Sequence, residues 1–463
     1  MKQLSDGQVV QLQAAAERLL GETGFRLQHP ELLARARRAG AAVEEASGRV
    51  RLPAPLLGEL LSQAPREYTI AGAGGFARQV GAGARQCLAI VTDPWILDYG
   101  TGRLRHPGLA DVRRHTRIAQ RLDEVAAISL MDYPVTDVAG PDSNLHALET
   151  CLLNHSKHIY VLAASEESLA RYLELGDLLR AAGTPAGPLM TAGVAVLSPL
   201  TLTGMNAGLL QTACARGLPV VPTVCPMAGS TGPYSKVGTL LLGHAENLFM
   251  AALTQILQPG HPFLYAFGPS ITDMRRGEDL YYTLDKVTWK LAGARLARHC
   301  GLPSSAECGG AMSCGYDPQA GAEGALFMAA AWESGAEVLA GIGSCCNAVG
   351  MSAEHMILQT AWLAAARHLG RGLGDGLEAA LRSIGRVGPG GQFMDDELTL
   401  ERLRSDEFFR HELFGYGEEG GSMLARAHAR AEELGAGEDS PLPTGVEEEI
   451  RRYFRDEYGR PAP

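Results

Sequence analysis

Short apolar runs alternate with longer amphipathic stretches through the middle of the chain. Eight runs are of β type, at residues 87–92, 128–131, 159–163, 190–196, 220–224, 263–267, 304–307 and 338–342. Eight helix-like stretches follow them, at residues 110–124, 144–154, 166–182, 202–216, 238–258, 281–301, 319–335 and 352–369. Continuous apolar strands joined by helical crossovers indicate a parallel sheet covered by helices. This pattern predicts an α/β fold, a (β/α)8 TIM barrel, rather than an open sheet with a dinucleotide fingerprint.

The segments that flank this pattern predict two additions to the barrel. Residues 1–85 read as a mainly helical N-terminal cap, in which Ser5 and Gln8 form a capping box at the start of a helix. Residues 86–390 then form the catalytic barrel domain. Residues 391–463 form an acidic helical tail.

Composition narrows the classes of function. The net charge is −11, and residues 391–463 hold 9 basic and 18 acidic residues, so no basic stripe for nucleic acid is present. No apolar run has the length of a membrane span and the first residues do not read as a signal peptide, so we expect a soluble, cytoplasmic protein. The nine cysteines show no C-x-x-C spacing and are expected to be reduced thiols.

A TIM barrel carries its chemistry in the loops after its strands, which gives a set of candidate residues. Aromatic residues are scarce, at 6% of the chain, yet many of them fall at these strand ends. Tyr265 and Phe267 are two residues apart on one strand and so share a face. Such rings suit a cationic methylammonium group, although each could equally fill the core. Among the other candidates in these loops are Tyr133, Arg275, Arg276, Tyr281, Tyr282, Tyr316, Asp317, Gln319, Asn347 and His355.

Other patterns leave alternatives open. Lysine side chains could supply a Schiff-base amine, but Lys286 and Lys290 are expected on an outer helix and are poorly placed for it. Glu246 lies among apolar residues in a helix, which favours a buried, paired carboxylate over a catalytic one. An open zinc site could form from Cys308, Cys314, Cys345, Cys346 and His355, although these residues lack paired spacing.

Several motifs in the same order resemble one known family. They are Asp98-Tyr99-Gly100-Thr101-Gly102-Arg103, Ser198-Pro199-Leu200, Gly217-Leu218-Pro219-Val220, Ala228-Gly229-Ser230-Thr231-Gly232-Pro233, Ala245-Glu246-Asn247, Asp273-Met274-Arg275, Asp317-Pro318-Gln319-Ala320-Gly321-Ala322-Glu323, Gly388-Pro389-Gly390-Gly391 and Leu398-Thr399-Leu400. Over nearly its full length the chain resembles the trimethylamine methyltransferase family, in its non-pyrrolysine branch of glycine betaine and quaternary-amine corrinoid methyltransferases. It departs from that pattern at 311–316, which is about one residue shorter and lacks a Ser-Asp pair and a Lys, and at 392–397, which lacks histidines.

The resemblance implies a reaction and a site. A methyl group would pass from an N-methylated amine to Co(I) of a partner corrinoid protein, with no tightly bound cofactor and no metal site in this chain. An aromatic cage would hold the amine, and Arg275 or Arg276 would clamp a carboxylate on it. Asp317, Gln319 and Glu323 would form the catalytic part, with Glu323 orienting its neighbours. The predicted cage consists of Tyr133, Tyr265, Phe267, Tyr281, Tyr282 and Tyr316, with Asn347 and His355 as further binding residues.

Two other functions stay open at this point. One is methyl transfer to tetrahydrofolate or a thiol, with zinc as a possible activator. The other is a non-catalytic barrel that binds methylated amines. We expect no nucleic-acid or membrane partner, and a homodimer is possible because barrels of this size often pair.

Overall fold

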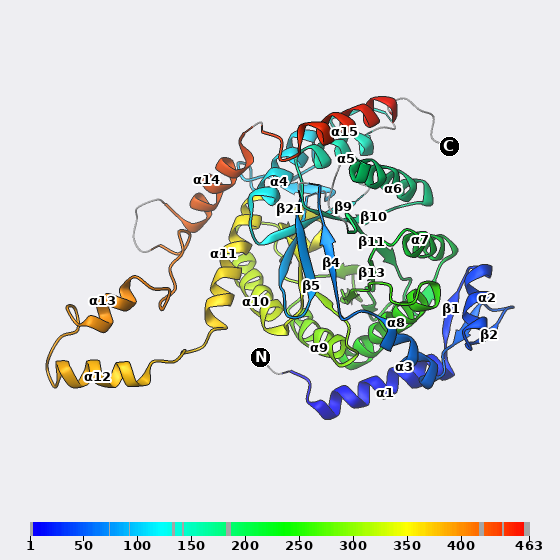
Figure 1. Cartoon of the computed structure of the whole chain (residues 1–463), viewed down its shortest axis with the longest axis horizontal. Helices are drawn as coiled ribbons and strands as arrows, with labels where there is room; N and C mark the ends of the chain where they lie inside the picture. The colour runs from blue at the N-terminus through cyan, green and yellow to red at the C-terminus, as the bar shows by residue number, and fades with distance from the viewer. Residues whose placement is uncertain are drawn as a thin grey trace.

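Eight parallel strands close into a barrel at the centre of the molecule (Figure 1). The computed structural model describes residues 3–73, 75–91, 93–131, 135–140, 143–181, 187–415, 421–437 and 439–457. A bridge between Val220 and Phe263 joins the two outer strands of the sheet and completes the ring. In sheet order the barrel strands are β13 (Val220–Thr223), β11 (Met190–Ala195), β10 (His158–Leu162), β9 (Val125–Met131), β6 (Gln86–Ile90), β19 (Val338–Ile342), β18 (Ser304–Glu307) and β15 (Tyr265–Ala266). The eight-unit barrel predicted from the sequence is therefore confirmed.

A layer of helices surrounds the strands. They begin at side-chain caps that the sequence supplies, such as Ser235 before α8 and Ser352 before α11. The eight helices are α4 (Leu109–Arg121), α5 (Ser143–Leu153), α6 (Glu166–Ala181), α7 (Gly204–Ala215), α8 (Lys236–Leu257), α9 (Asp285–His299), α10 (Pro318–Ser334) and α11 (Ala353–Leu369). Among the described helices, α8 alone is long and apolar enough to cross a membrane, and 83% of its most apolar window is buried, as expected of a core helix.

The N-terminal part combines helices with short strands and packs against one side and the bottom of the barrel. The capping box of Ser5 and Gln8 starts α1. Its elements are α1 (Asp6–Glu22), β1 (Phe25–Leu27), α2 (Pro30–Arg38), β2 (Ala42–Glu44), β3 (Arg49–Arg51), α3 (Ala54–Gln63), β4 (Glu67–Ala71) and β5 (Ala77–Gly81). The β4–β5 hairpin brings Tyr68, Ile70 and Val80 against Tyr160 and Leu264, and this cluster closes the barrel floor.

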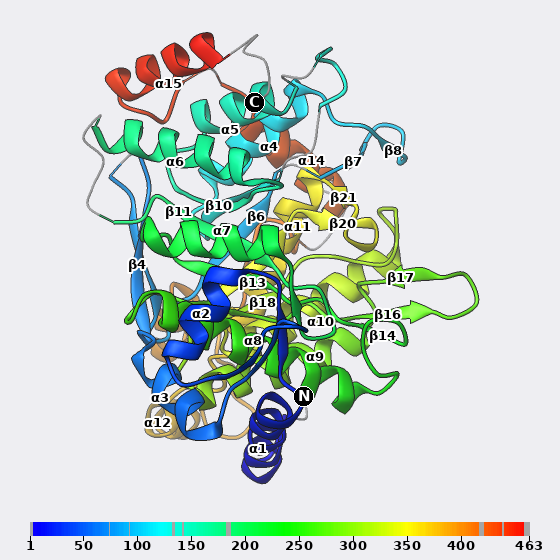
Figure 2. The same ribbon diagram turned by 90° about the vertical axis from the view of Figure 1, so that its right-hand side faces the viewer.

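Small sheets decorate the opposite end, where the barrel strands finish. They comprise β7 (Trp95–Leu97), β8 (Leu104–Arg105), β14 (Met227–Ala228), β16 (Ser270–Asp273), β17 (Glu278–Leu280), β20 (Ser344–Cys345) and β21 (Gly350–Met351), and β12 (Thr201–Leu202) joins the N-terminal sheet. The hairpin of β16 and β17 projects from the body of the molecule (Figure 2).

After α11 the chain leaves the barrel as an extended arm, residues 370–415, and then returns. The arm carries α12 (Leu377–Val387) and α13 (Glu397–Leu403), which lie away from the barrel in Figure 1. The helices α14 (Met423–Gly435) and α15 (Thr444–Glu457) return to the barrel, where Ala427 and Ile450 join its main core.

Candidate functional site

A cavity of about 160 Å³ lies inside the barrel, above the floor cluster. Leu88, Val221, Leu264 and Ala340 contribute to its apolar wall. Its polar groups include Cys225, Tyr281 and Glu307. Cys225 follows the carboxyl end of β13, Glu307 is the last residue of β18, and Tyr281 follows β17 in the connection from β15 to α9. A largely apolar hollow with a few polar groups at this end of a barrel is the ordinary form of a small-molecule site.

Three polar atoms converge beside Gly268, just after β15. A Cβ at position 268 would lie 2.7 Å from Tyr281 Oη, 3.0 Å from Cys225 Sγ and 3.1 Å from Glu307 Oε1. Only a residue without a side chain leaves this space free. The hydroxyl of Tyr281 donates a hydrogen bond to Glu307 Oε1. Burial, followed by the nearby charge of Glu307, raises the pKa of the Cys225 thiol to about 12, so the group is a neutral thiol at pH 7.

Glu307 also has a cationic neighbour from the helix layer. Lys286, near the start of α9, is 0% exposed and places Nζ 3.4 Å from Glu307 Oε2. The same Nζ lies 2.8 Å from the centroid of the Tyr281 ring. Burial lowers the pKa of Lys286 and the charge of Glu307 opposes that effect. The sequence placed Lys286 and Lys290 on an outer helix, which is correct, but their side chains are buried and Lys286 pairs with Glu307 of the cavity wall.

Tyr281 is held in place through its backbone. Asn347 Oδ1 accepts hydrogen bonds from the amides of Tyr281, at 2.7 Å, and Tyr282, at 3.3 Å. Asn347 lies in a run of three consecutive non-glycine residues with left-handed φ, Cys346 at 51°, Asn347 at 55° and Ala348 at 66°. Such a backbone costs energy and persists where the surrounding structure imposes it, often at functional sites. Asn347 therefore does not line the cavity itself but holds the backbone of the segment that carries Tyr281.

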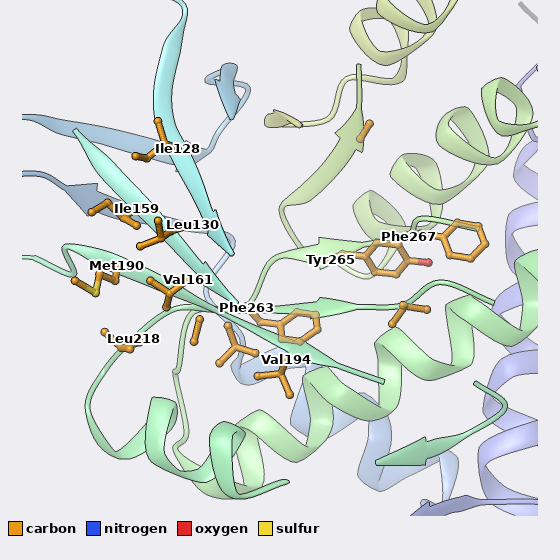
Figure 3. Close-up of a cluster of buried hydrophobic side chains, with 14 of the residues drawn as sticks. Ile128, Leu130, Ile159, Val161, Met190, Val194, Leu218, Phe263, Tyr265 and Phe267 are labelled. Carbon is orange, nitrogen blue, oxygen red and sulfur yellow. The ribbon is translucent and has the colours of Figure 1, made fainter. Parts of the chain in front are cut away.

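The rings of Tyr265 and Phe267 share a face, as predicted, but that face is turned toward the helices. The hydroxyl of Tyr265 lies 3.2 Å from Nδ1 of His244 on α8. A Cβ on Gly243 of α8 would lie 2.1 Å from the Phe267 ring. Figure 3 shows both rings on the helix side of their strand. Phe267 still borders the cavity, but Leu264, Ala266 and Gly268 are the alternate positions that face it, so this pair does not form the predicted cage.

Three further predicted binding residues, Tyr282, Tyr316 and His355, lie outside the cavity wall. The ring of Tyr282 packs over Gly310, with its hydroxyl 3.1 Å from Ser344 Oγ. Tyr316 stacks on His355 at 5.2 Å and donates to Glu354 Oε2 at 2.8 Å. Burial lowers the pKa of His355 to about 4. None of Tyr282, Tyr316 and His355 lines the cavity.

The predicted carboxylate clamp, Arg275 and Arg276, lies away from the cavity. Arg275 and Arg276 lie at the turn of the β16–β17 hairpin, where both are exposed, and neither lines the cavity. The structure therefore does not bring this clamp to the cavity, because the hairpin extends outward. Tyr133 lies outside the described residues.

Asp317, Gln319 and Glu323 lie together at the start of α10, where Asp317 is the N-cap residue and hydrogen bonds connect Asp317 and Glu323 to the preceding loop. Asp317 accepts from the amide of Ala320 at 2.8 Å and from Ser313 at 2.6 Å. Gln319 donates to Glu323 at 2.9 Å, and Glu323 accepts from the amide of Met312 at 2.8 Å. The hydrogen bonds of these three residues are local and serve to shape residues 312–317. None of the three lines the cavity.

The cysteine arrangement does not provide a zinc site within the described ranges. Across those residues no group of three or more His, Cys, Asp or Glu side chains is placed to hold a metal ion. Cys308, Cys345 and Cys346 are buried as free thiols, and Cys314 is exposed.

The sequence contains a signal for two cavity residues that were not predicted from it, Ser305 and Glu307. Ser305 and Glu307 are polar and two apart in a strand that is otherwise buried, so they share a face, and both line the cavity. Polar side chains in a buried barrel strand point to its interior, where a site can use them. Lys286 gave no comparable signal, because a lysine at the start of a surface helix is ordinary.

Comparison with known proteins places the chain in a family. The family model for trimethylamine methyltransferase (MTTB) matches residues 1–458. The chain belongs to the MTTB family. A glycine betaine methyltransferase from Desulfitobacterium hafniense (strain Y51) is 26% identical over 453 residues, covering 93% of this chain and 91% of that protein. An L-carnitine:corrinoid methyltransferase from Eubacterium limosum is 24% identical over 419 residues, covering 86% and 84%.

A solved structure agrees with the fold of this MTTB-family chain. The crystal structure of the hydroxylamine complex of MtmB superposes with a TM-score of 0.50, covering 98% of this chain and 88% of that one. The two sequences are 13% identical, so the likeness shows the fold alone.

Proposed function

We propose that the protein is a corrinoid-dependent methyltransferase that moves a methyl group from a quaternary, betaine-like amine, or another N-methylated amine, to Co(I) of a partner corrinoid protein. The observation that carries this proposal is the apolar cavity at the carboxyl ends of the barrel strands of an MTTB-family chain. The relatives whose names include glycine betaine and carnitine support the choice of donor.

The reaction asks little acid–base chemistry of the chain. The electron pair of Co(I) forms a bond to the methyl carbon, the C–N bond breaks, and its electrons stay on nitrogen, which leaves as a neutral tertiary amine. A quaternary nitrogen needs no proton to become a leaving group. We therefore assign the chain the tasks of binding the donor, orienting it and excluding water.

An apolar cavity suits this change of charge. The donor is cationic in the ground state and loses that charge in the transition state, so a wall with many free carboxylates would stabilise the ground state more. The Tyr281 ring borders the cavity and offers a cation–π contact. We propose that Asn347 acts by fixing Tyr281, and that Asp317, Gln319 and Glu323 act by shaping the loop at the mouth.

For the remaining predicted residues we propose roles outside the cavity wall. Tyr282, Tyr316 and His355 would support the wall from behind. Arg275 and Arg276, on their projecting hairpin, would meet a substrate carboxylate only if the hairpin folds over the mouth.

A panel of N-methylated amines tests the proposal. The purified protein is incubated with each amine and chemically reduced Co(I) cobalamin, and the methyl-Co(III) absorption spectrum is followed. We expect methylation with at least one quaternary amine and none with the amine alone. Amine binding by calorimetry with no transfer would instead favour a binding protein, and transfer only to tetrahydrofolate or a thiol would redirect the function to that acceptor.

The arm supports pairing of two copies of the chain. Leu377, Leu381 and Ile384 recur on one side of α12 and are 74%, 53% and 58% exposed, and Leu373 is 99% exposed. A contiguous apolar face of this kind marks a protein interface. We propose a homodimer in which each arm packs on the other copy. Replacing Leu377 and Leu381 by Glu should yield monomers in light scattering, and an unchanged mass would refute the role of the arm.

We also keep the division into a cap (1–85), a catalytic barrel (86–390) and a tail (391–463) as a proposal, with the first barrel strand beginning at Gln86. We propose a cytoplasmic location, which suits nine unpaired thiols. An amine and a corrinoid protein are the proposed partners; a net charge of −11 disfavours nucleic acid, and no membrane partner is proposed.

A further inference from the structure

The ion pair of Lys286 and Glu307 joins a residue of the cavity wall to a buried lysine of the helix layer. Glu307 lines the cavity, and its side chain is 17% exposed, whereas that of Lys286 is 0% exposed. Among the described residues, Lys286 Nζ and Glu307 Oε2 make no hydrogen bond of standard geometry. The two groups are thus held together by charge at 3.4 Å, with the ammonium resting on the Tyr281 ring.

Without its cation, Glu307 would be a negative charge in a mostly apolar hollow. Charges interact more strongly there than in water, so a quaternary ammonium group would bind the carboxylate as an ion pair. That attraction fades as the nitrogen becomes neutral in the transition state. A free Glu307 would therefore tighten substrate binding and slow the methyl transfer.

We propose that Lys286 is a positioning residue that neutralises Glu307, so that the cavity accepts a quaternary ammonium group without trapping it. This inference rests on the proposed function and adds a specificity device to the same site. The two oxygens of Glu307 divide the work, since Oε1 accepts from Tyr281 and Oε2 faces the ammonium.

The neighbouring Lys290 provides a matched control. It lies one turn further along α9, is 3% exposed, and places Nζ 4.2 Å from the Phe327 ring centroid. It does not line the cavity and has no ion pair with Glu307 within the described ranges. Lys286→Met and Lys290→Met thus remove the same buried side chain from the same helix, with and without an ion pair to Glu307.

The experiment combines binding and turnover in the full-length protein. Binding of tetramethylammonium is measured by calorimetry without any corrinoid, and kcat and KM are measured with the best donor of the panel and Co(I) cobalamin. In Lys286→Met we expect Kd and KM to fall about ten-fold and kcat to fall about ten-fold, so that kcat/KM changes less than either. In Lys290→Met each value should change less than about two-fold.

A double variant separates charge from folding. Glu307→Gln alone leaves Lys286 unpaired and should weaken tetramethylammonium binding about ten-fold, whereas Lys286→Met with Glu307→Gln should return Kd and kcat to within about three-fold of the wild type. Equal or weaker binding in folded Lys286→Met, or a double variant no better than Glu307→Gln, overturns the inference while wild-type turnover stands. If the wild type neither binds nor demethylates any quaternary amine, the proposed function fails and this inference fails with it.

Discussion

The neighbouring strands β15 and β18 carry conspicuous residues in the same alternating way, yet they direct them to opposite sides of the barrel wall. Tyr265 and Phe267 from the β15 region face the helix layer, where His244 and Gly243 receive them. Glu307 of β18 faces the cavity, where it meets Tyr281. Because successive side chains alternate, one step in register decides whether a residue belongs to the core or to the site.

The contrast teaches that size and chemistry alone do not select site residues in a barrel. The large rings fill the space between strands and helices, where they exclude water most effectively. The small side chain of Ala266 in β15, and Gly268 just after this strand, leave the cavity open. The proposed chemistry then depends on β18, whose cavity-lining residues Ser305 and Glu307 are both polar. The following predictions test this assignment of faces, in order of decreasing effect.

Removing the inward carboxylate should have the largest effect. In Glu307→Ala the ammonium of Lys286 stays buried without its ion-pair partner, so we expect the free energy of unfolding to fall by about 3–5 kcal/mol. The measurement is urea denaturation at pH 7. Ser305→Ala, on the same inward face, serves as the control and should cost less than about 1 kcal/mol. A loss below about 1 kcal/mol in Glu307→Ala would show that the pair is not buried as described.

Two glycines test the two faces directly. Gly268→Val would put a side chain where Tyr281, Cys225 and Glu307 converge, so kcat/KM for the best donor should fall about 100-fold. Gly243→Ala would push on the outward Phe267 ring and should cost about 1–3 kcal/mol of stability. Activity per folded molecule should persist in Gly243→Ala. The reverse pattern, with activity lost at position 243 and kept at 268, would exchange the two faces.

Much of the fold was open to prediction, whereas the site was open only in part. The eight barrel strands and their helices follow from apolar runs and caps, because burial on both faces leaves a strong local pattern. The predicted aromatic rings do not gather into one cage. At 263–267 both faces of the strand are buried, so the sequence does not indicate which side chains point into the barrel. Glu307 could be predicted, because Ser305 and Glu307 are polar residues two apart in a buried strand and so share a face. Lys286 could not, because only tertiary packing brings the first turn of α9 over Tyr281.

Acid should lower the free energy of unfolding through His244, the buried histidine of α8 that contacts Tyr265. Burial lowers the pKa of His244 to about 3, because its ring lies buried between Tyr265 and Gln13 of α1. A histidine whose folded pKa is depressed contributes stability above its unfolded pKa, near 6.5, and loses it as the pH falls. From pH 7 to pH 5 we expect this one group to cost about 2 kcal/mol. His244→Gln should therefore show a correspondingly smaller loss of stability over that range in urea denaturation, and an unchanged loss would contradict a buried, neutral ring.

The smallest effect is expected when the hydroxyl of Tyr265 is removed. Comparing this variant with Tyr281→Phe tests most directly which of the two rings faces the cavity. Tyr265→Phe removes a single buried hydrogen bond to His244, so it should cost about 1 kcal/mol of unfolding free energy. It should leave kcat and KM within about two-fold of the wild type, because the ring faces the helices. Tyr281→Phe removes the hydrogen bond to Glu307 at the cavity and should change KM for the donor several-fold. If instead KM responds to Tyr265→Phe and not to Tyr281→Phe, the ring that meets the substrate lies on β15, and the faces of the two strands must be reassigned.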